Sequence, residues 1–211
     1  MTNKKTIAFL LSFFFLLSAG FMYYFYKTTK AQPKHLPILG VPGHKVGAFS
    51  FTNQDGKTVT NKDLDGKIYV AEYFFTTCKS ICPKMNDNMA KVFQEFRGNK
   101  DFMILSHTVD PEHDSVPVLS KYAAKFEADP HRWAFLTGDK KELYDMARYS
   151  YLVTVEEAPS ATPVPIADDF IHTERFVLID KQKQIRGSYD GTSPQEVQQM
   201  IGDIKELMKE D

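Results

Sequence analysis

The sequence predicts a mixed α/β domain that follows a single transmembrane helix. Two observations support this prediction. Residues Ile7–Tyr26 form one apolar run without a charged side chain, and from Phe49 onward strand-like segments alternate with helix-like segments. About 20 residues in a helix extend roughly 30 Å, which is enough to cross the hydrocarbon core of a bilayer. We therefore expect one folded domain attached to a membrane anchor.

The first 46 residues divide into three expected parts. They are a short cytoplasmic tail (1–6), a transmembrane anchor (7–26) and a proline- and glycine-rich tether (27–46), and the domain then covers 47–211. The alternative is a cleaved signal peptide, whose apolar stretch is shorter, about 7–15 residues, and ends in a small-residue cleavage site. Ser18-Ala19-Gly20 matches such a site poorly, so we expect a retained anchor.

The orientation and the cell compartment follow from the same segment. A very short tail before one apolar segment usually stays in the cytoplasm, which places the domain on the other side, where thiols can oxidise. Since no long Arg-rich presequence precedes the apolar run, we expect a bacterial inner membrane with the domain in the periplasm.

The charge balance excludes one class of function. The chain has 26 basic and 27 acidic residues, and four of the lysines lie among the first 30 residues. The remaining domain is therefore mildly acidic, which argues against a nucleic-acid-binding protein.

The domain shows a clear order of elements. Asp55-Gly56 within Phe49–Asn61 predicts a hairpin, and Lys67–Phe75 is a continuous β-rich run of the kind buried in a central sheet. Because proline is tolerated only in the first turn of a helix, the helix that ends near Phe96 begins within a few residues before Pro83. The other expected elements are strands 102–110, 133–136, 175–180 and 184–189, helices 116–126, 140–149 and 195–209, and an irregular segment 154–169.

This order predicts the fold class. Strand, helix, strand, helix, strand, strand, helix is the order of a thioredoxin-like fold, here with a β-hairpin added at its N-terminal side.

Cys78 and Cys82 are the only cysteines, and they come directly after the predicted strand Lys67–Phe75. They could form a structural disulfide, a redox-active dithiol or a pair of thiolate ligands for a soft metal. The positive end of the helix and Lys79 would both lower the pKa of the thiols, which favours the redox and metal interpretations. A structural disulfide would close a loop too small to restrict the unfolded chain much.

His172 is the strongest candidate among the six histidines for a third group at this site. It lies just before the strand 175–180. In thioredoxin-like proteins this loop packs against the dithiol, usually through a cis-proline, whereas here it reads Ile171-His172-Thr173. The default interpretation of His107, inside an apolar strand, is a core histidine with its hydrogen bonds satisfied. His113 lies among acids and is expected in a solvated loop.

Two thiolates and one imidazole suit copper. Thiolate favours Cu(I), and imidazole is accepted by both oxidation states. A closed structural zinc site would need four ligands, and only three are evident. Met85 and Met89 could assist with thioether sulfur, but at this spacing core packing is favoured. Asp110 follows the strand 102–110 at the same sheet edge as the thiols and could orient a ligand, or simply form the turn.

Three motifs together resemble one known family. CKSICP (78–83), VDPEHD (109–114) and DDFIHTERFVLID (168–180) are similar in order and spacing to the Sco/SenC proteins, over Leu36 to the C-terminus. The resemblance implies a thioredoxin-like domain that binds one copper ion through Cys78, Cys82 and His172. It also implies a role in assembling the binuclear copper centre of cytochrome c oxidase. Asp110 matches the family's acidic position after the strand and is expected near the ligands.

The sequence therefore predicts a metallochaperone rather than an enzyme. It would receive copper from a donor, need a thiol reductant, and pass the copper to the copper-accepting subunit of cytochrome c oxidase. The alternative is an extracytoplasmic thiol–disulfide oxidoreductase that reduces cysteines of the apo-oxidase or another target, which needs Cys78 and Cys82 but not His172. A thiol peroxidase is disfavoured, because Ala71 and Phe75 stand where peroxiredoxins have Pro and Thr or Ser.

Overall fold

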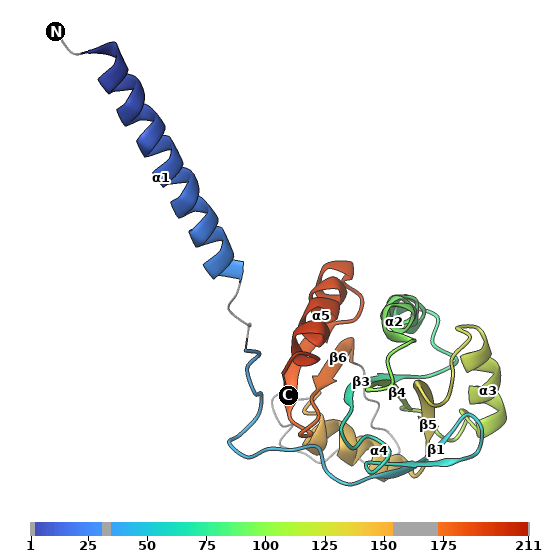
Figure 1. Ribbon diagram of the computed structural model, residues 1–211. Coiled ribbons are helices and arrows are strands. Elements are labelled where there is room, and N and C mark those ends of the chain that lie inside the picture. Colours follow the sequence, from blue (N-terminus) through green and yellow to red (C-terminus); the bar gives the residue numbers. More distant parts are fainter. Residues whose placement is uncertain (1–2, 31–34, 154–172, 211) are drawn as a thin grey trace, which may run out of the picture. The chain divides into compact units, whose positions relative to one another are not determined.

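The computed structural model describes residues 3–30, 35–153 and 173–210, and it separates into two compact units. The first unit contains the helix α1 (Lys4–Lys30). Its segment Lys4–Tyr26 is long and apolar enough to cross a membrane, and none of it is buried against protein. The second unit, from Leu36 onward, is the folded domain (Figure 1).

A seven-stranded mixed sheet forms the centre of the domain, in the order β2-β1-β5-β4-β3-β6-β7. β3, β4 and β5 are parallel, and β1, β6 and β7 each run antiparallel to the neighbours with which they pair. The strands are β1 (Ser50–Asn53), β2 (Thr58–Thr60), β3 (Ile68–Phe74), β4 (Phe102–Thr108), β5 (Trp133–Thr137), β6 (Arg175–Ile179) and β7 (Ile185–Asp190).

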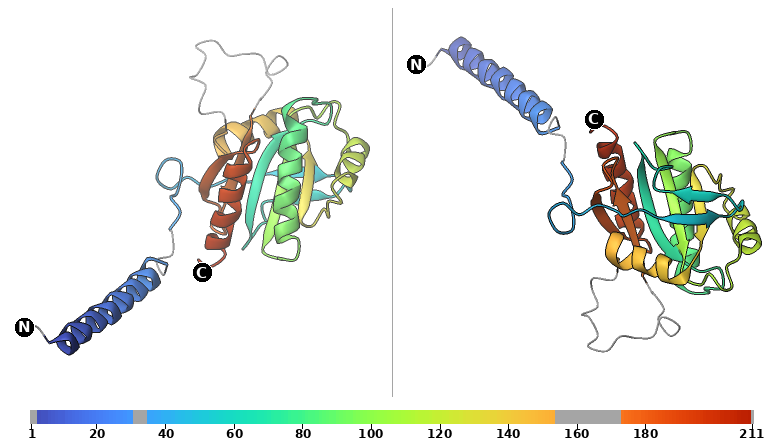
Figure 2. Two further views of the ribbon diagram at one scale, coloured as in Figure 1. Left: turned by 90° about the horizontal axis from the view of Figure 1, so that it is seen from above. Right: turned by 90° about the horizontal axis from the view of Figure 1, so that it is seen from below.

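The helices cover the two faces of this sheet. They are α2 (Ile81–Phe96), α3 (Val116–Ala124), α4 (Lys140–Asp145), which continues as the π-helical segment η1 (Met146–Ser150), and α5 (Pro194–Leu207). Figure 2 shows α2 and α5 over one face and α4 on the other. The predicted strand–helix order and the thioredoxin-like fold are confirmed.

Several sequence signals act as expected. Gly56 adopts a positive φ of 74° in the β1–β2 turn, where a side chain would be strained. The helix α2 begins two residues before Pro83, so the proline falls in its first turn. The helix expected over 140–149 differs in its second half, which is the π-helical η1, and nothing in the structure explains this change. The expected irregular segment 154–169 lies outside the described residues.

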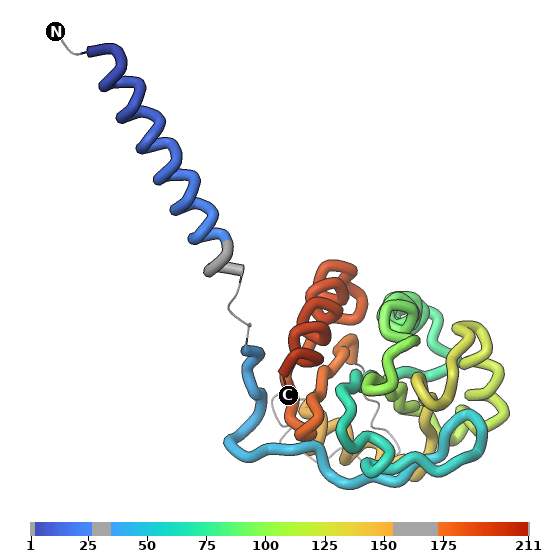
Figure 3. The backbone as a smooth tube through the Cα atoms, viewed as in Figure 1, coloured from blue at the N-terminus to red at the C-terminus, as the bar shows by residue number. Residues whose placement is uncertain are grey.

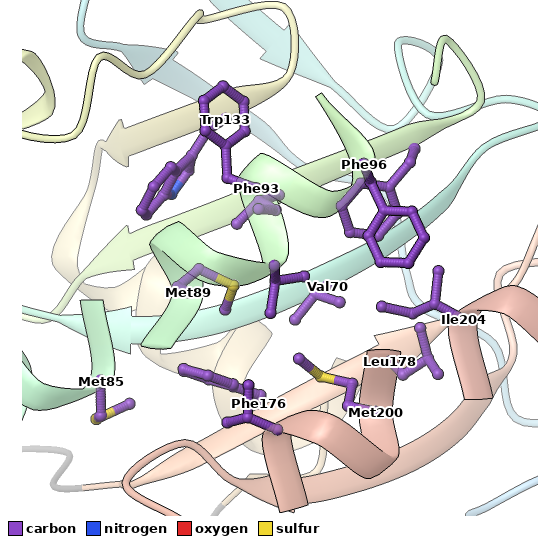
Figure 4. Packing of buried hydrophobic residues seen from close by; sticks show 14 of the residues in the cluster. Val70, Met85, Met89, Phe93, Phe96, Trp133, Phe176, Leu178, Met200 and Ile204 are labelled. Atoms are coloured by element: carbon purple, nitrogen blue, oxygen red, sulfur yellow. The ribbon is translucent and has the colours of Figure 1, made fainter. Parts of the chain in front are cut away.

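The core between the sheet and α2, α3 and α5 contains most of the large apolar side chains. Met85 and Met89 are fully buried in it, which confirms the prediction that they pack in the core. In Figure 4 the side chain of Met89 lies near Val70 and Phe176. The second core, on the opposite face, is built by alternate residues of the same strands together with α4, η1 and the segment before β1.

The second half of the expected tether, residues 27–46, belongs to the domain instead. Leu36 and Val46 are buried, and the Leu39 backbone pairs with Ile185 of β7. The side chain of Arg186 holds this segment, donating to the carbonyl oxygens of Leu36 at 2.8 Å and Pro37 at 3.2 Å. Burial of apolar side chains against the domain is more favourable than their exposure to water, so this part of the expected tether packs onto the fold.

The same guanidinium forms ion pairs with Asp180 at 2.9 Å and Glu210 at 3.0 Å. We call these contacts of Arg186 with Leu36, Pro37, Asp180 and Glu210 the Arg186 clasp.

Candidate metal centre

The two cysteines lie where the central strand β3 leads into α2. The backbone leaves β3 at Phe74, passes through a loop of six residues and enters α2 (Figure 3). The loop carries Cys78, and Cys82 is the second residue of α2. Both are free thiols. Cys78 is partly exposed, whereas Cys82 is only 2% exposed and packs against the α2 core. One sulfur is therefore open to a reaction partner and the other is sheltered behind it.

The sulfur of Cys78 takes the place of an N-cap side chain. Ser80 stands at the N-cap of α2, but its hydroxyl makes no capping hydrogen bond. Instead the backbone N–H of Cys82 donates to Cys78 Sγ at 3.4 Å, and Ser80 Oγ lies 3.7 Å from the same sulfur. The first N–H groups of a helix lack intrahelical acceptors, so they stabilise negative charge on an atom placed here.

The surroundings of the two thiols shift their pKa values in opposite directions. Burial opposes ionisation of Cys78, but hydrogen bonds from Cys82 and Ser80 outweigh it and lower the pKa of Cys78 to about 7. Burial, and then the hydrogen bond shared with Cys78, raise the pKa of Cys82 to about 12. The prediction that the helix N-terminus lowers the thiol pKa thus holds for Cys78 and is reversed for Cys82, because Cys82 points into the core.

Asp114 fixes the loop that presents Cys78. Its carboxylate is fully buried and accepts hydrogen bonds from the Thr76 backbone N–H at 3.2 Å, from the Thr76 hydroxyl, and from the Thr108 hydroxyl at 2.5 Å. It therefore joins the end of β4 to the loop after β3. Sequence reasoning missed Asp114, because the DPEHD segment contains two aspartates and nothing in the local pattern shows which one is buried.

Asp110 has a different environment. Its carboxylate lies 2.8 Å from Nδ1 of His113, whose ring is exposed as predicted, and the Asp110 backbone N–H donates to Thr108 Oγ1. A role for Asp110 near a bound metal stays a prediction.

Another buried acidic residue, Glu72, lies in β3 on the face that α2 covers. Its Oε1 accepts a hydrogen bond from Ser106 Oγ at 2.5 Å, and Ser106 Oγ in turn accepts one from the indole N–H of Trp133 at 2.8 Å. Burial raises the pKa of Glu72 to about 8, although the Ser106 hydrogen bond opposes this. Sequence reasoning missed Glu72 as well. The available signal was a single acid inside an otherwise apolar strand.

The described residues supply two of the three predicted ligands. His172 lies outside them, and within them no group of three His, Cys, Asp or Glu side chains could hold a metal ion. Two sulfurs at one helix N-terminus, one of them easily ionised, fit a soft metal that binds thiolate. Completion of the site by His172 stays a prediction.

Comparison with known proteins agrees with this geometry. A SCO1/SenC family model matches residues 41–209. A SCO1 protein homolog from Bacillus subtilis is 30% identical over 191 residues, covering 90% of this chain and 94% of that protein.

Two solved structures are similar over most of the domain. BsSco, a member of the Sco family of cytochrome c oxidase assembly proteins in which a disulfide switch was identified, is 30% identical with a TM-score of 0.67, covering 83% of this chain and 98% of that one. Copper-bound ScoI from Bradyrhizobium japonicum is 26% identical with a TM-score of 0.59, covering 77% and 99%. In sequence and in fold, the chain therefore belongs to the SCO1/SenC family.

Proposed function

We propose that the protein binds one copper ion through Cys78, Cys82 and His172 and delivers it to the binuclear copper centre of cytochrome c oxidase. The observation that carries this is the pair of unequal thiols at the N-terminus of α2, in a family whose members include copper-bound structures. Copper is the cargo here. An accessible thiolate at Cys78 can make the first bond to the metal, and Cys82 can follow once the metal replaces its proton.

The ligand set is tested by titrating the reduced domain, which is a compact unit from Leu36 onward, with Cu(I) and Cu(II). We expect one tight equivalent, weakened at least tenfold by His172→Ala. His131→Ala is the matched control, since His131 is exposed and far along the chain from the three ligands. Equal affinities of the two variants would remove His172 from the site, and unchanged binding by Cys78→Ser would overturn the proposal altogether.

Membrane attachment is part of the same proposal. We infer that α1 anchors the chain in the bacterial inner membrane with the domain in the periplasm, close to a membrane-bound oxidase. The length and composition of α1 support this. The full-length protein should stay with membranes after alkaline carbonate washing. A reporter enzyme that is active only in the periplasm should be active when it is fused after Asp211. An inactive fusion would indicate the opposite orientation.

A second candidate function is thiol–disulfide exchange. It is favoured by the partly exposed Cys78 with its lowered pKa and by the disulfide switch in BsSco. In this reaction the Cys78 thiolate attacks a target disulfide, and Cys82 then displaces the target thiol, leaving a Cys78–Cys82 disulfide. A thiol reductant would restore the pair. Rapid reduction of a model disulfide that ignores His172→Ala, together with weak copper binding, would favour this function.

A further inference from the structure

Exposed apolar side chains are rare on this domain and occur on two segments, the one that precedes β1 and η1. Among the described residues of the domain, large apolar side chains are exposed only at Ile38 (55%), Val41 (71%) and Tyr149 (71%). Single apolar residues scattered over a surface are common, whereas a group of them indicates an interaction site. We call Ile38, Val41 and Tyr149 the apolar triad.

The two segments that carry the apolar triad contact each other. Nε2 of His44 lies 2.9 Å from the carbonyl oxygen of Ser150 in η1, and the backbone N–H of Gly47 donates to the Ser150 hydroxyl at 3.4 Å. A turn fixes the first segment, since the backbone N–H of His44 donates to the carbonyl oxygen of Val41 at 2.9 Å. Val41 therefore lies in a fixed turn whose last residue contacts the neighbour of Tyr149.

The first of these segments is also basic. No acidic residue precedes Asp55, so all 27 acidic residues lie from there onward, whereas six lysines precede it. One of the six, Lys45, belongs to the folded segment and is exposed. Apolar side chains beside lysines suit an anionic lipid surface, because the apolar groups enter the interfacial layer while the lysines meet lipid phosphates.

The chain between α1 and this segment is short. Only residues 31–35 separate the last residue of α1 from Leu36, which is buried and held by the Arg186 clasp. Ile38 follows two residues later. If α1 crosses the bilayer, Ile38 and Val41 are the exposed apolar residues of the domain that lie nearest along the chain to the lipid surface. This connectivity favours a lipid surface over a soluble protein as the partner of the apolar triad.

We propose that the apolar triad and Lys45 dock the domain onto the surface of the membrane that holds α1. Ile38 and Val41 enter the interfacial layer of the lipids, and Lys45 contacts anionic headgroups. The inference rests on the membrane attachment under the proposed function.

The position of this surface in the fold leaves the thiols free. Leu39, between Ile38 and Val41, pairs with Ile185 of β7, which lies across β6 from the first residues of β3. Cys78 instead follows the last residue of β3. Docking through Ile38 and Val41 therefore keeps Cys78 accessible to a copper donor or acceptor.

Methyl NMR of the full-length, metal-free protein in lipid nanodiscs tests the contact. The discs contain phosphatidylethanolamine, anionic phosphatidylglycerol and a lipid carrying chelated gadolinium, which broadens the signals of nearby methyl groups. We expect strong broadening at Ile38 and Val41 and little at Val118 in α3, a helix that contacts β1 and β5. Sharp signals at Ile38 and Val41 would reject the lipid surface and leave a protein as the partner of the apolar triad.

Val41→Ser separates docking from simple tethering, which by itself brings Ile38 toward the lipids. The side chain of Val41 is 71% exposed, so the variant keeps the fold. Broadening at Ile38 should fall at least about threefold, because even partial burial of a valine side chain in lipid is favourable. Val118→Ser is the matched control and should leave the broadening unchanged. Equal broadening at Ile38 in Val41→Ser and wild type would overturn the proposal.

The lipid composition tests the role of charge. With phosphatidylcholine in place of phosphatidylglycerol, broadening at Ile38 should weaken, because Lys45 then meets no net negative headgroup. Equal broadening in both lipids would remove Lys45 from the docking surface. The outcomes also separate the two proposals. If α1 does not stay with membranes, the proposed attachment fails and the docking fails with it. If α1 stays with membranes but Val41→Ser has no effect, only the docking fails.

Discussion

Each face of the central sheet buries an ionisable side chain from a central strand, and the two side chains have different surroundings. Glu72 in β3 points toward α2, and His107 in the neighbouring strand β4 points toward the opposite core. Both side chains are 0% exposed. Glu72 has a hydrogen bond from Ser106, whereas neither ring nitrogen of His107 has a hydrogen-bond partner among the described residues.

Aromatic rings surround His107 instead. Its ring stacks on Tyr73 at 5.1 Å and meets Phe51 edge-on at 5.5 Å. The sequence-based prediction of a core histidine is confirmed in its burial, but its hydrogen bonds are not satisfied as expected. Burial raises the pKa of Glu72 to about 8 and lowers the pKa of His107 to about 3, so both are neutral near pH 7. The comparison teaches that burial with little hydrogen bonding keeps both groups neutral near pH 7, although one is an acid and the other a base.

The largest expected effect concerns Glu72 as the pH rises from about 4.5 to 8. Its pKa is 4.5 when exposed and about 8 in the fold, so the unfolded chain loses this proton first and stability falls as the pH rises from about 4.5 to 8. By pH 8 this costs about 4 kcal/mol. Urea unfolding should show Glu72→Gln gaining stability over wild type across this range. Glu95→Gln, at an exposed surface ion pair, should show no such trend.

His107 should give the opposite dependence, at acid pH. Its pKa falls from 6.5 to about 3 on folding, so the stability that it preserves above pH 6.5 is lost as the pH drops toward 3. At pH 4 the loss is about 3 kcal/mol. His107→Leu should abolish this part of the acid sensitivity, measured by urea unfolding at pH 4 and 7, while His131→Gln should retain it. Acid sensitivity that persists in His107→Leu would contradict our account of this face.

On the α2 face, the two thiols should react at very different rates. At pH 7 about half of Cys78 is thiolate, whereas Cys82 is almost entirely protonated and only 2% exposed. Alkylation with iodoacetamide, followed by peptide mass spectrometry, should modify Cys78 at least about 100-fold faster. The rate at Cys78 should rise with a midpoint near pH 7. Comparable rates at both cysteines would mean that the first turn of α2 opens readily.

The smallest effect is expected at the sheet edge that both faces share. Asp114→Asn replaces an acceptor of three hydrogen bonds by a side chain that must turn its NH2 group toward a donor. We expect a loss of about 1–2 kcal/mol in the free energy of unfolding and weaker copper binding, because the Thr76 loop loosens. Asp110→Asn is the control and should change stability by less than about 0.5 kcal/mol. Equal effects of the two variants would refute the special role of Asp114.

Local patterns predicted most of the fold and the position of the thiols. Pro83 placed the start of α2, and the apolar run Lys67–Phe75 placed β3, so both cysteines fell at a helix N-terminus. What the pattern could not show depends on partners distant in sequence. Ser106, which bonds to Glu72, is 34 residues away, and Asp114 is 38 residues from Thr76. The difference between the pKa values of Cys78 and Cys82 likewise depends on how deeply each thiol is buried and on its hydrogen bonds, which the local pattern does not show.

The Arg186 clasp shortens the segment of chain between α1 and the domain. Because the clasp fastens Leu36 and Pro37, only residues 31–35 separate α1 from the fastened chain. Five residues extend at most roughly 17 Å. If α1 crosses the bilayer as we propose, these five residues limit how far the start of the domain can lie from the end of α1. A connection this short would raise the effective concentration of the domain near a membrane-bound partner, so Arg186 would influence how often the domain meets that partner.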